Sequence, residues 1–458
     1  MFDLARAMAD NPQVQRRKRG VILSPSGWQR LQAAEQQAAD RYNAGKAYTL
    51  EQLGERTGLS PNTITKVRRR RLAVDRQTLE FYFNALSLSL NPDDYISIDS
   101  EKPIQSLQKP LRGQVPLDSN LYVERPPLES IAYEEILQPG ALIRIKAPRQ
   151  FGKTSLMSRM LKVAQDRGLR TTVLNFQLAD ALVFQNLDRF LRWFCAVITR
   201  DLRLPNRIEE HWDEVFGSNY NCTDYFENYL LPQLSSPLVL ALDEVDAVYQ
   251  YPAIAADFFG MLRAWYEKSR YGSSDSQIWQ QFRLLVIHST EAYLPLNLTQ
   301  SPFNVGLLLE LPTFTLEQVQ DLATRYHLEP DGVALPLFEL LGGIPYLTQM
   351  ALHYLTSHDG TLYQLIQTSI AADSPFSPHL RRRLSHLQEH SGLLSTYAQI
   401  VQSETPIDVN LLQAFRLQSL GLVKLVNLQA APACQLYRSY FGRVLPVLSE
   451  TPETGRLK

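Results

Sequence analysis

The chain has 458 residues, of which 45% are hydrophobic and 20% are charged, so it is long enough for about two to four domains and too apolar to be disordered throughout. No run reaches the roughly 20 apolar residues of a membrane-spanning helix, and the first residues lack the apolar core of a secretory signal. The three cysteines, Cys195, Cys222 and Cys434, lie far apart, which argues against a disulfide framework or a zinc site and is typical of a reducing compartment. We therefore expect a cytoplasmic protein without membrane association.

The formal net charge of −1 conceals an uneven distribution along the chain. Residues 1–90 contain 15 Lys and Arg residues against 8 Asp and Glu residues, a local net charge of +7, so the remaining residues are acidic. A basic segment of this kind suits a polyanionic partner. Residues 1–96 are expected to form a basic, all-α domain. Residues 97–127, which are rich in Pro and Ser, are expected to form a linker.

Capping signals within residues 1–96 predict four helices, of which the second and third form a helix-turn-helix. The helices are expected at 26–42, from the capping box of Thr49 to Gly58, from Ser60-Pro61 to Arg70, and after Asp75. Two short helices joined by a tight glycine turn, the second of them polar and basic, suit the major groove of DNA.

The third of these helices carries the predicted contacts with double-stranded DNA. They are Asn62, Thr63 and Thr65 at base edges, and Lys66, Arg68 and Arg69 at phosphates. Further phosphate contacts are expected from Arg71 and from the basic run Arg16, Arg17, Lys18 and Arg19. The alternative is a helical module that binds protein, in which the basic residues form only a solvated face.

A phosphate-binding loop is predicted after an apolar strand at 141–146. The run APRQFGKTS, residues 147–155, has the register of a Walker A loop, with Ala147 where the first glycine usually stands. Loop amides and the N-terminus of the following helix donate to phosphates, Lys153 reaches the β- and γ-phosphates, and Thr154 supplies an oxygen to Mg²⁺. The residues expected to bind ATP are Ala147, Gln150, Phe151, Gly152, Lys153, Thr154 and Ser155.

Two further strands are expected to end at the same site. The run at 238–242 ends in Asp243 and Glu244, 90 residues after Lys153. An acid at this strand end can hold Mg²⁺, here Asp243, and Glu244 can orient or activate the attacking water. The strand at 284–287 ends in His288, Ser289 and Thr290; either hydroxyl residue could sense the γ-phosphate, whereas His288 is interpreted as a packing residue.

The order of these motifs predicts an α/β fold. Short apolar runs alternate with amphipathic stretches over 128–312, which is typical of a parallel sheet covered by helices. We expect a P-loop NTPase core over 128–312, a helical lid over 313–378 and a C-terminal winged helix over 379–450.

The motifs together resemble the AAA-like domain family that is common in cyanobacteria and related to the STAND class of signalling ATPases. The similar segments are 147–156, LALDEVD at 240–246, 288–291, 301–306 and GGIPYL at 342–347, within about residues 115–445. Residues 1–96 resemble the helix-turn-helix domain associated with von Willebrand A and MoxR systems.

This resemblance implies further site residues. Gly343-Ile344-Pro345 matches a GxP motif whose proline packs on adenine, so Pro345 is the expected adenine contact; family members often have His where Ile344 stands. The segment 411–445 resembles a winged helix that closes over nucleotide. Arg438 within it could reach a phosphate, although a surface or packing role suits it equally.

The leading functional hypothesis is an ATP-binding and ATP-hydrolysing switch with a DNA-binding head, in regulatory or defence-like signalling. MgATP would clamp the sheet domain to the lid and the winged helix, and hydrolysis would release them. Unidentified effector proteins would carry the output, and an ATP-dependent homo-oligomer is compatible with this scheme. One alternative is a replication- or transposition-type AAA+ machine that oligomerises on DNA and remodels it. Another is an adaptor that does not hydrolyse ATP and whose head binds protein.

Overall fold

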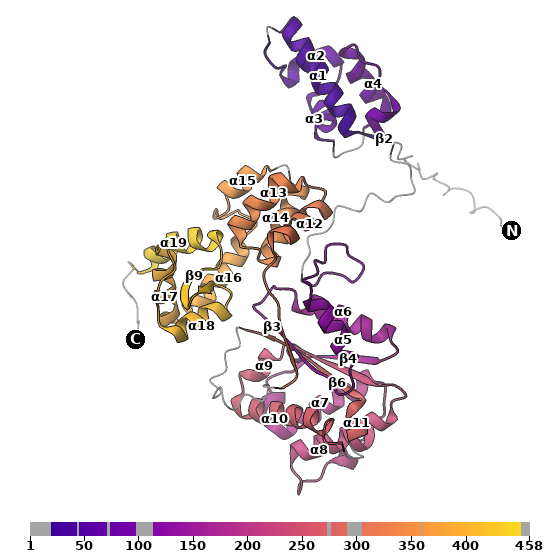
Figure 1. The fold of residues 1–458 in the computed structure, drawn as a ribbon, viewed down its shortest axis with the longest axis vertical. Helices are drawn as coiled ribbons and strands as arrows, with labels where there is room; N and C mark the ends of the chain where they lie inside the picture. Colours follow the sequence, from indigo (N-terminus) through magenta and orange to yellow (C-terminus); the bar gives the residue numbers. More distant parts are fainter. Residues whose placement is uncertain are drawn as a thin grey trace, which may run out of the picture. The chain divides into compact units, whose positions relative to one another are not determined.

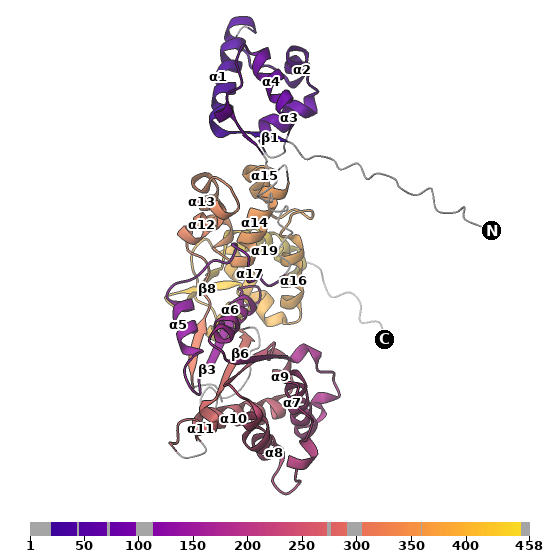
Figure 2. The ribbon, with the colours of Figure 1, turned by 90° about the vertical axis from the view of Figure 1, so that its right-hand side faces the viewer.

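The computed structural model describes residues 20–43, 45–70, 74–97, 113–272, 276–290, 305–358 and 360–449. The chain divides into two compact units, Met1–Lys109 and Pro110–Lys458 (Figures 1 and 2). Several sequence expectations lie outside the described residues: those for Arg16, Arg17, Lys18, Arg19, Arg71 and 301–304. Among the helices of the described ranges, none combines the length and the apolarity that crossing a bilayer requires.

Within its described residues, the first unit has four α-helices and a two-stranded antiparallel sheet. Its elements are β1 (Val21–Leu23), α1 (Pro25–Tyr42), α2 (Leu50–Thr57), α3 (Pro61–Arg69), α4 (Arg76–Ala85) and β2 (Tyr95–Ser97). The expectation of an all-α domain is therefore wrong. Strands of three residues are too short to show an alternating pattern, and each finds its partner at the opposite end of the unit, so local sequence gives no sign of the pairing.

The caps of α2 and α3 are those that the sequence predicts. Thr49 and Gln52 form a reciprocal capping box at the start of α2, and Gly58 ends this helix with a left-handed φ of 69°. The Ser60 hydroxyl accepts the Thr63 amide at 3.2 Å and so begins α3. Ile64 and Val67 of α3 are fully buried, which leaves the polar side of the helix facing outward.

The second unit is built on a five-stranded parallel sheet, which confirms the α/β expectation. In sheet order the strands are β4 (Arg170–Asn175), β5 (Leu238–Asp243), β6 (Phe282–Ser289), β3 (Leu142–Ala147) and β7 (Leu307–Glu310). Strand β6 lies between the strand that leads into the phosphate-binding loop and the strand that ends in Asp243. Strand β7 was not expected, because its four residues follow a segment without a clear pattern.

Side chains of the sheet alternate between two apolar cores. Ile143 and Ile145 of β3 belong to a core that includes α6, whereas Leu142 of the same strand belongs to a core that includes α7 and α10. Figures 1 and 2 show α5 and α6 on one side of the sheet and α7, α8 and α10 on the other. The helices are α5 (Leu128–Glu135), α6 (Lys153–Asp166), α7 (Leu187–Asp201), α8 (Ser218–Asp224), α9 (Asp246–Tyr249), α10 (Pro252–Lys268) and α11 (Ser276–Gln280).

Helices dominate the part of the second unit that follows β7. They are α12 (Leu316–Arg325), α13 (Pro330–Leu341), α14 (Pro345–Ser357), α15 (Leu362–Gln367), α16 (Ser377–Gln388), α17 (Ser391–Gln402), α18 (Leu411–Ser419) and α19 (Gln435–Ser449). A hairpin of β8 (Val423–Val426) and β9 (Gln429–Pro432) lies between α18 and α19. The core on the α6 side of the sheet continues without a break into α12 to α19.

Candidate functional site

A cavity of about 340 Å³ lies at the carboxyl ends of β3, β5 and β6. Its wall is formed by the loop after β3, the acidic end of β5, the end of β6, the start of α14 and the segment before α5. Ten of the residues selected from the sequence line it: Gln150, Phe151, Gly152, Lys153, Thr154, Ser155, Asp243, Glu244, Ser289 and Pro345. Residues 195 positions apart in the sequence thus meet in one cavity.

The loop between β3 and α6 has the backbone shape of an anion nest. Gln150 and Gly152 have left-handed φ angles of 70° and 92°, which turns successive amide groups toward one side. Glycine adopts the second of these angles without steric cost. Helix α6 begins at Lys153, and no side chain caps its N-terminus, so its first amides remain available to an anion.

Lys153 lies across the mouth of this nest. Its Nζ donates to the carbonyl oxygens of Ala147 at 3.0 Å and Pro148 at 3.1 Å. The Thr154 side chain at the next position is partly exposed to the cavity. An ammonium group and a hydroxyl group therefore stand at the start of α6, where the helix dipole adds further positive potential.

The end of β5 and the start of α9 bring three carboxylates, Asp243, Glu244 and Asp246, to the wall of the same cavity. Burial, followed by repulsion from Glu244, raises the pKa of Asp243, and the charge of Lys153 acts in the opposite direction. Glu244 has a left-handed φ of 55°, and its amide donates to Asp243 Oδ1 at 3.0 Å. Strain of this kind in a non-glycine residue is concentrated at functional sites.

Asp246, the third carboxylate, holds the end of β6 in place. Its Oδ1 and Oδ2 accept the Ser289 amide at 2.9 Å and 3.2 Å. Burial raises the pKa of Asp246 to about 6, despite the opposing effects of this hydrogen bond and of Lys153. Asp246 was not among the residues predicted for the site, although it stands three residues after Asp243 and begins α9.

The burial of Asp246 predicts a pH-dependent difference in stability between the chain and an Asp246→Asn variant. Because the folded-state pKa of about 6 exceeds the ordinary 3.8, the stabilising contribution of this group is complete below pH 3.8 and is lost as the pH rises through 6. An amide does not titrate, and its oxygen can still accept the Ser289 amide. Relative to wild type, the variant should gain about 1 kcal/mol of unfolding free energy between about pH 5 and pH 7.5.

Urea denaturation of the ligand-free chain at both pH values measures this difference. Titrating groups that do not interact with Asp246 affect the wild type and the variant alike and cancel in the comparison. If the unfolding free energies of the variant and the wild type differed by the same amount at the two pH values, a buried charged carboxylate at this position would be contradicted.

The segment that precedes α5 forms another wall of the cavity, although the sequence predicted a linker there. The Arg125 side chain is 4% exposed; its Nη1 donates to the Phe151 carbonyl at 3.0 Å, and its backbone amide donates to Glu129 at 2.7 Å. The Val115 amide donates to Ser155 Oγ at 2.9 Å. The alternation of buried Leu121 and Val123 was the signal for this packing, and the proline content of the region obscured it.

The start of α14 contributes Pro345, Tyr346 and Gln349 to the cavity wall. A tight approach positions this helix: a side chain on Gly343 would bring its Cβ to 2.1 Å from the Phe314 carbonyl oxygen, so only glycine fits. Gly343 also has a φ of 68°, in the left-handed region. The glycine before Pro345 is thus explained by backbone geometry alone.

Three of the selected residues do not line the cavity. Ala147 ends β3, and its carbonyl oxygen accepts Lys153 Nζ and the Thr290 amide. The Thr290 hydroxyl donates to the Ser419 carbonyl. Of the two hydroxyl residues at the end of this strand, Ser289 is therefore the one that lines the cavity. The Arg438 guanidinium lies on α19 and donates to the Ser403 carbonyl.

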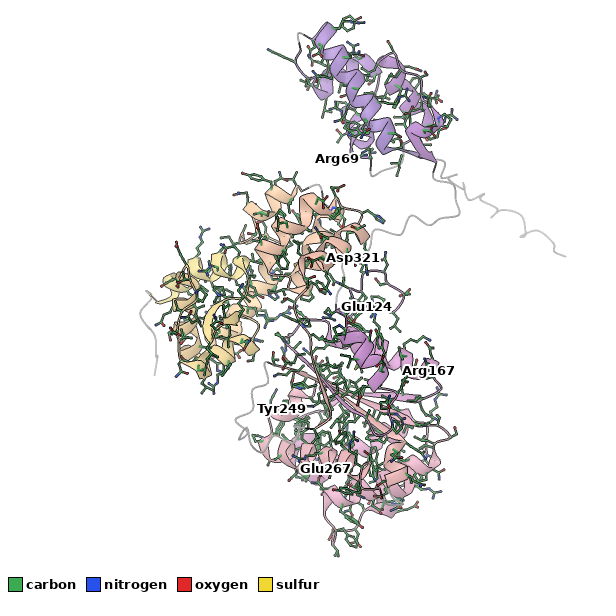
Figure 3. The ribbon with its side chains drawn as sticks, viewed as in Figure 1. Arg69, Glu124, Arg167, Tyr249, Glu267 and Asp321 are labelled. Atoms are coloured by element: carbon green, nitrogen blue, oxygen red, sulfur yellow. The ribbon has the colours of Figure 1, made fainter. Side chains whose placement is uncertain are left out.

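His288, which was interpreted as a packing residue, is enclosed at the cavity wall. Burial, with a smaller effect of Lys146, lowers the pKa of His288 to about 4, so the ring is neutral near pH 7. Its ring lies 6.5 Å from that of Tyr249 in α9, which is labelled in Figure 3. A neutral imidazole here adds no charge to the site.

The six residues selected on α3 occupy different environments. Asn62, Lys66 and Arg69 are exposed and follow one another at helical spacing on one face; Arg69 is labelled in Figure 3. The Thr65 hydroxyl donates to the Pro61 carbonyl at 2.7 Å, and Thr63 bonds the Ser60 hydroxyl at 2.9 Å.

Arg68 differs from its neighbours because it lies inside a hydrogen-bonded triad. It forms an ion pair with Glu35 of α1 and donates from Nε to the Tyr82 hydroxyl at 3.2 Å. Tyr82 donates in turn to Glu35 at 2.6 Å. Arg68 therefore joins α3 to α1 and α4.

The donors at the cavity fit a nucleoside triphosphate and its Mg²⁺. Amides at a helix N-terminus that no side chain caps, a lysine and a neighbouring hydroxyl suit phosphate oxygens. No group of three His, Cys, Asp or Glu in the described part of the chain could hold a metal by itself. Mg²⁺ is ordinarily held by one or two protein oxygens together with phosphates and waters, for which Thr154 and Asp243 suffice.

Comparison with known proteins gives matches over the second unit. The AAA-like domain family matches residues 110–443. A WD repeat-containing protein of Synechocystis sp. is 26% identical over 340 residues, which cover 67% of this chain. The chain spans only 28% of that relative's length.

Among solved structures, a Walker-type ATPase of Pyrococcus abyssi superposes with a TM-score of 0.51 at 13% identity, over 72% of this chain and 98% of that chain. The Aeropyrum pernix ORC1 protein, solved in complex with DNA, gives a TM-score of 0.36 at 14% identity, over 73% of this chain and 96% of that chain. At such identities, the similarity to the Walker-type ATPase concerns the fold alone.

Proposed function

The chain belongs to the AAA-like domain family, and we propose that it is an ATP-binding and ATP-hydrolysing switch. One observation carries the proposal: Lys153, at the tip of an amide nest, and Asp243, at an acidic strand end, line the same cavity. A triphosphate with its metal requires positive donors and carboxylates around one cavity, and both kinds of group line this one. The proposal requires that the full chain binds ATP through Lys153. It is tested by removing this ammonium group, which should abolish ATP binding.

The roles proposed for the site residues follow from their positions. Thr154 and Asp243 would hold Mg²⁺, which neutralises phosphate charge. Glu244 would orient and deprotonate the attacking water, and Ser289 would contact the γ-phosphate. Pro345 and the buried wall around Arg125 would enclose the base.

We propose further that α17, α18, the β8–β9 hairpin and α19 form a winged helix that responds to the nucleotide, as in STAND-type switches. This proposal is supported by direct contacts with the loop: a side chain on Gly421 would come within 3.1 Å of Pro148. The Thr290–Ser419 hydrogen bond adds a second contact, between the residue that follows β6 and the last residue of α18. A nucleotide that changes the loop would therefore also affect these contacts.

The first unit is proposed to be a DNA-binding helix-turn-helix of the kind associated with von Willebrand A and MoxR systems. The polar face of α3, with Asn62, Lys66 and Arg69, would enter the major groove. Arg68 is excluded from the proposed surface because its charge is paired with Glu35. Its role in this proposal is to hold α3 against α1 and α4.

Binding to double-stranded DNA should depend on the exposed basic residues of α3 and on salt. Removing Lys66 and Arg69 together by alanine substitution should weaken binding and reduce the slope of log affinity against log salt concentration by about 2, because about two counterion-releasing phosphate contacts are lost. Fluorescence anisotropy of a labelled duplex across a salt series measures both effects.

Arg41→Ala is the control, because it removes a positive charge from an exposed position on α1 rather than on α3. The control should keep the wild-type slope. Affinity without salt dependence in the wild type, or an equal loss in the control, would favour a protein-binding head.

A further inference from the structure

A buried histidine connects the phosphate-binding loop to the C-terminal helix. His379 of α16 is 3% exposed. Its Nδ1 lies 2.8 Å from Gln150 Oε1 in the loop, and its Nε2 lies 2.7 Å from the Tyr437 hydroxyl oxygen in α19. Three segments that are far apart in the sequence are thus joined by two consecutive side-chain hydrogen bonds.

The chemistry of the three groups determines the direction of both hydrogen bonds. A carboxamide oxygen only accepts, so His379 donates from Nδ1 to Gln150. Burial, followed by the charges of Arg383 and Arg382, lowers the pKa of His379 to about 3, so the ring is neutral and its Nε2 accepts the Tyr437 hydroxyl hydrogen. The ring is also stacked on Tyr437, with centroids 5.9 Å apart and planes inclined by 8°.

The loop end of this connection is the strained position of the nest. Gln150 has a left-handed φ of 70°, which a non-glycine residue adopts only when its surroundings hold it there. Arg383, one turn after His379 on α16, donates to the neighbouring Arg149 carbonyl at 3.5 Å. Helix α16 therefore contacts the loop at two successive residues.

We propose that His379 is a positioning residue that holds Gln150 in the nest conformation and couples the loop to Tyr437 of α19. The inference rests on the proposed nucleotide site. A loop that is held in its binding shape before the phosphates arrive binds them more tightly. The same bonds transmit any change of the loop to α19, and the coupling is reciprocal.

A double-mutant cycle on ATP affinity tests the inference. The variants are Tyr437→Phe, His379→Leu and the two combined in the full chain, with Tyr440→Phe as the control. Tyr440 lies one turn further along α19, and within the described residues its hydroxyl makes no hydrogen bond. Titration with a fluorescent ATP analogue and Mg²⁺ gives each dissociation constant, and thermal melting shows that each variant is folded.

We expect Tyr437→Phe to weaken ATP binding by about 5-fold and His379→Leu by about 10-fold, within the usual range of coupling between sites. The double variant should bind no more weakly than His379→Leu alone, because the hydroxyl acts only through the imidazole. Tyr440→Phe should bind like the wild type. If His379→Leu does not fold, the same double-mutant cycle is carried out with Gln150→Ala and Tyr437→Phe, and it tests the coupling between the loop and α19 in the same way.

The inference is overturned if Tyr437→Phe binds ATP as tightly as the wild type. It is also overturned if the losses of ATP affinity in the two single variants multiply in the double variant, because independent packing defects add in free energy. These results leave the proposed function intact as long as the wild type binds ATP and Lys153→Ala does not. Equal binding by the wild type and Lys153→Ala would overturn the nucleotide site itself, and the inference with it.

Discussion

Replacing Lys153 by alanine is expected to lower the affinity for ATP by at least about 100-fold. The ammonium group lies at the mouth of the nest, and its loss removes a charge-assisted contact with the phosphates from a partly buried site. The substitution also removes a positive charge that acts on Asp243 and Asp246, so less of their negative charge is compensated at the site. Equilibrium titration of the full chain with MgATP measures the loss.

Lys162→Ala is the matched control for this experiment. Lys162 lies on the same helix, α6, but it is exposed and pairs with Asp166 at 2.6 Å. Its removal should leave the affinity within about 2-fold, since exposed ion pairs contribute little. Repeating the wild-type titration with EDTA separates the contribution of the metal. If Lys153→Ala bound ATP as tightly as Lys162→Ala, the cavity would not be the nucleotide site.

Replacing Glu244 by glutamine is expected to reduce ATP hydrolysis by about 100- to 10,000-fold while leaving ATP binding nearly unchanged. A glutamine preserves the shape of the side chain but cannot take a proton from the attacking water. Binding should persist because the proposed donors to the phosphates, Lys153 and the amides at the start of α6, are unchanged in this variant. Phosphate release under saturating MgATP measures the rate, and the titration used for Lys153 measures the affinity.

Glu267→Gln provides the control for loss of a carboxylate. Glu267 of α10 pairs with Arg263 at 2.8 Å and does not line the cavity; it is labelled in Figure 3. Its hydrolysis rate should equal that of the wild type. A Glu244→Gln variant that still hydrolyses ATP at the wild-type rate would show that another group activates the water.

Local signals in the sequence were sufficient for the elements that carry the site. The strands β3, β5 and β6 are short, largely apolar runs, and the structure brings their carboxyl ends together because parallel strands share one edge. The helix caps at Thr49, Gly58 and Ser60 could also be predicted from the sequence, because each depends on residues within one helical turn.

Features that depend on long-range contacts were not predictable in the same way. The pairing of β1 with β2 joins the two ends of the first unit, and Arg125 reaches the loop from a segment whose prolines indicated a linker. Arg68 belongs to a basic run, yet its partner Glu35 lies 33 positions away. The basic run therefore indicated the charge of α3 but not which side chain was already engaged.

The sheet of the second unit has two faces with different neighbours. The core on the α7 and α10 side belongs to the sheet and its own helices, whereas the core on the α6 side is continuous with α12 to α19. If the C-terminal helices moved away from the sheet, buried apolar side chains would therefore become exposed to solvent, and only on this face of the sheet. Such an opened form would bind a hydrophobic dye, which makes it detectable. It would also present an exposed apolar surface to which a partner protein could bind.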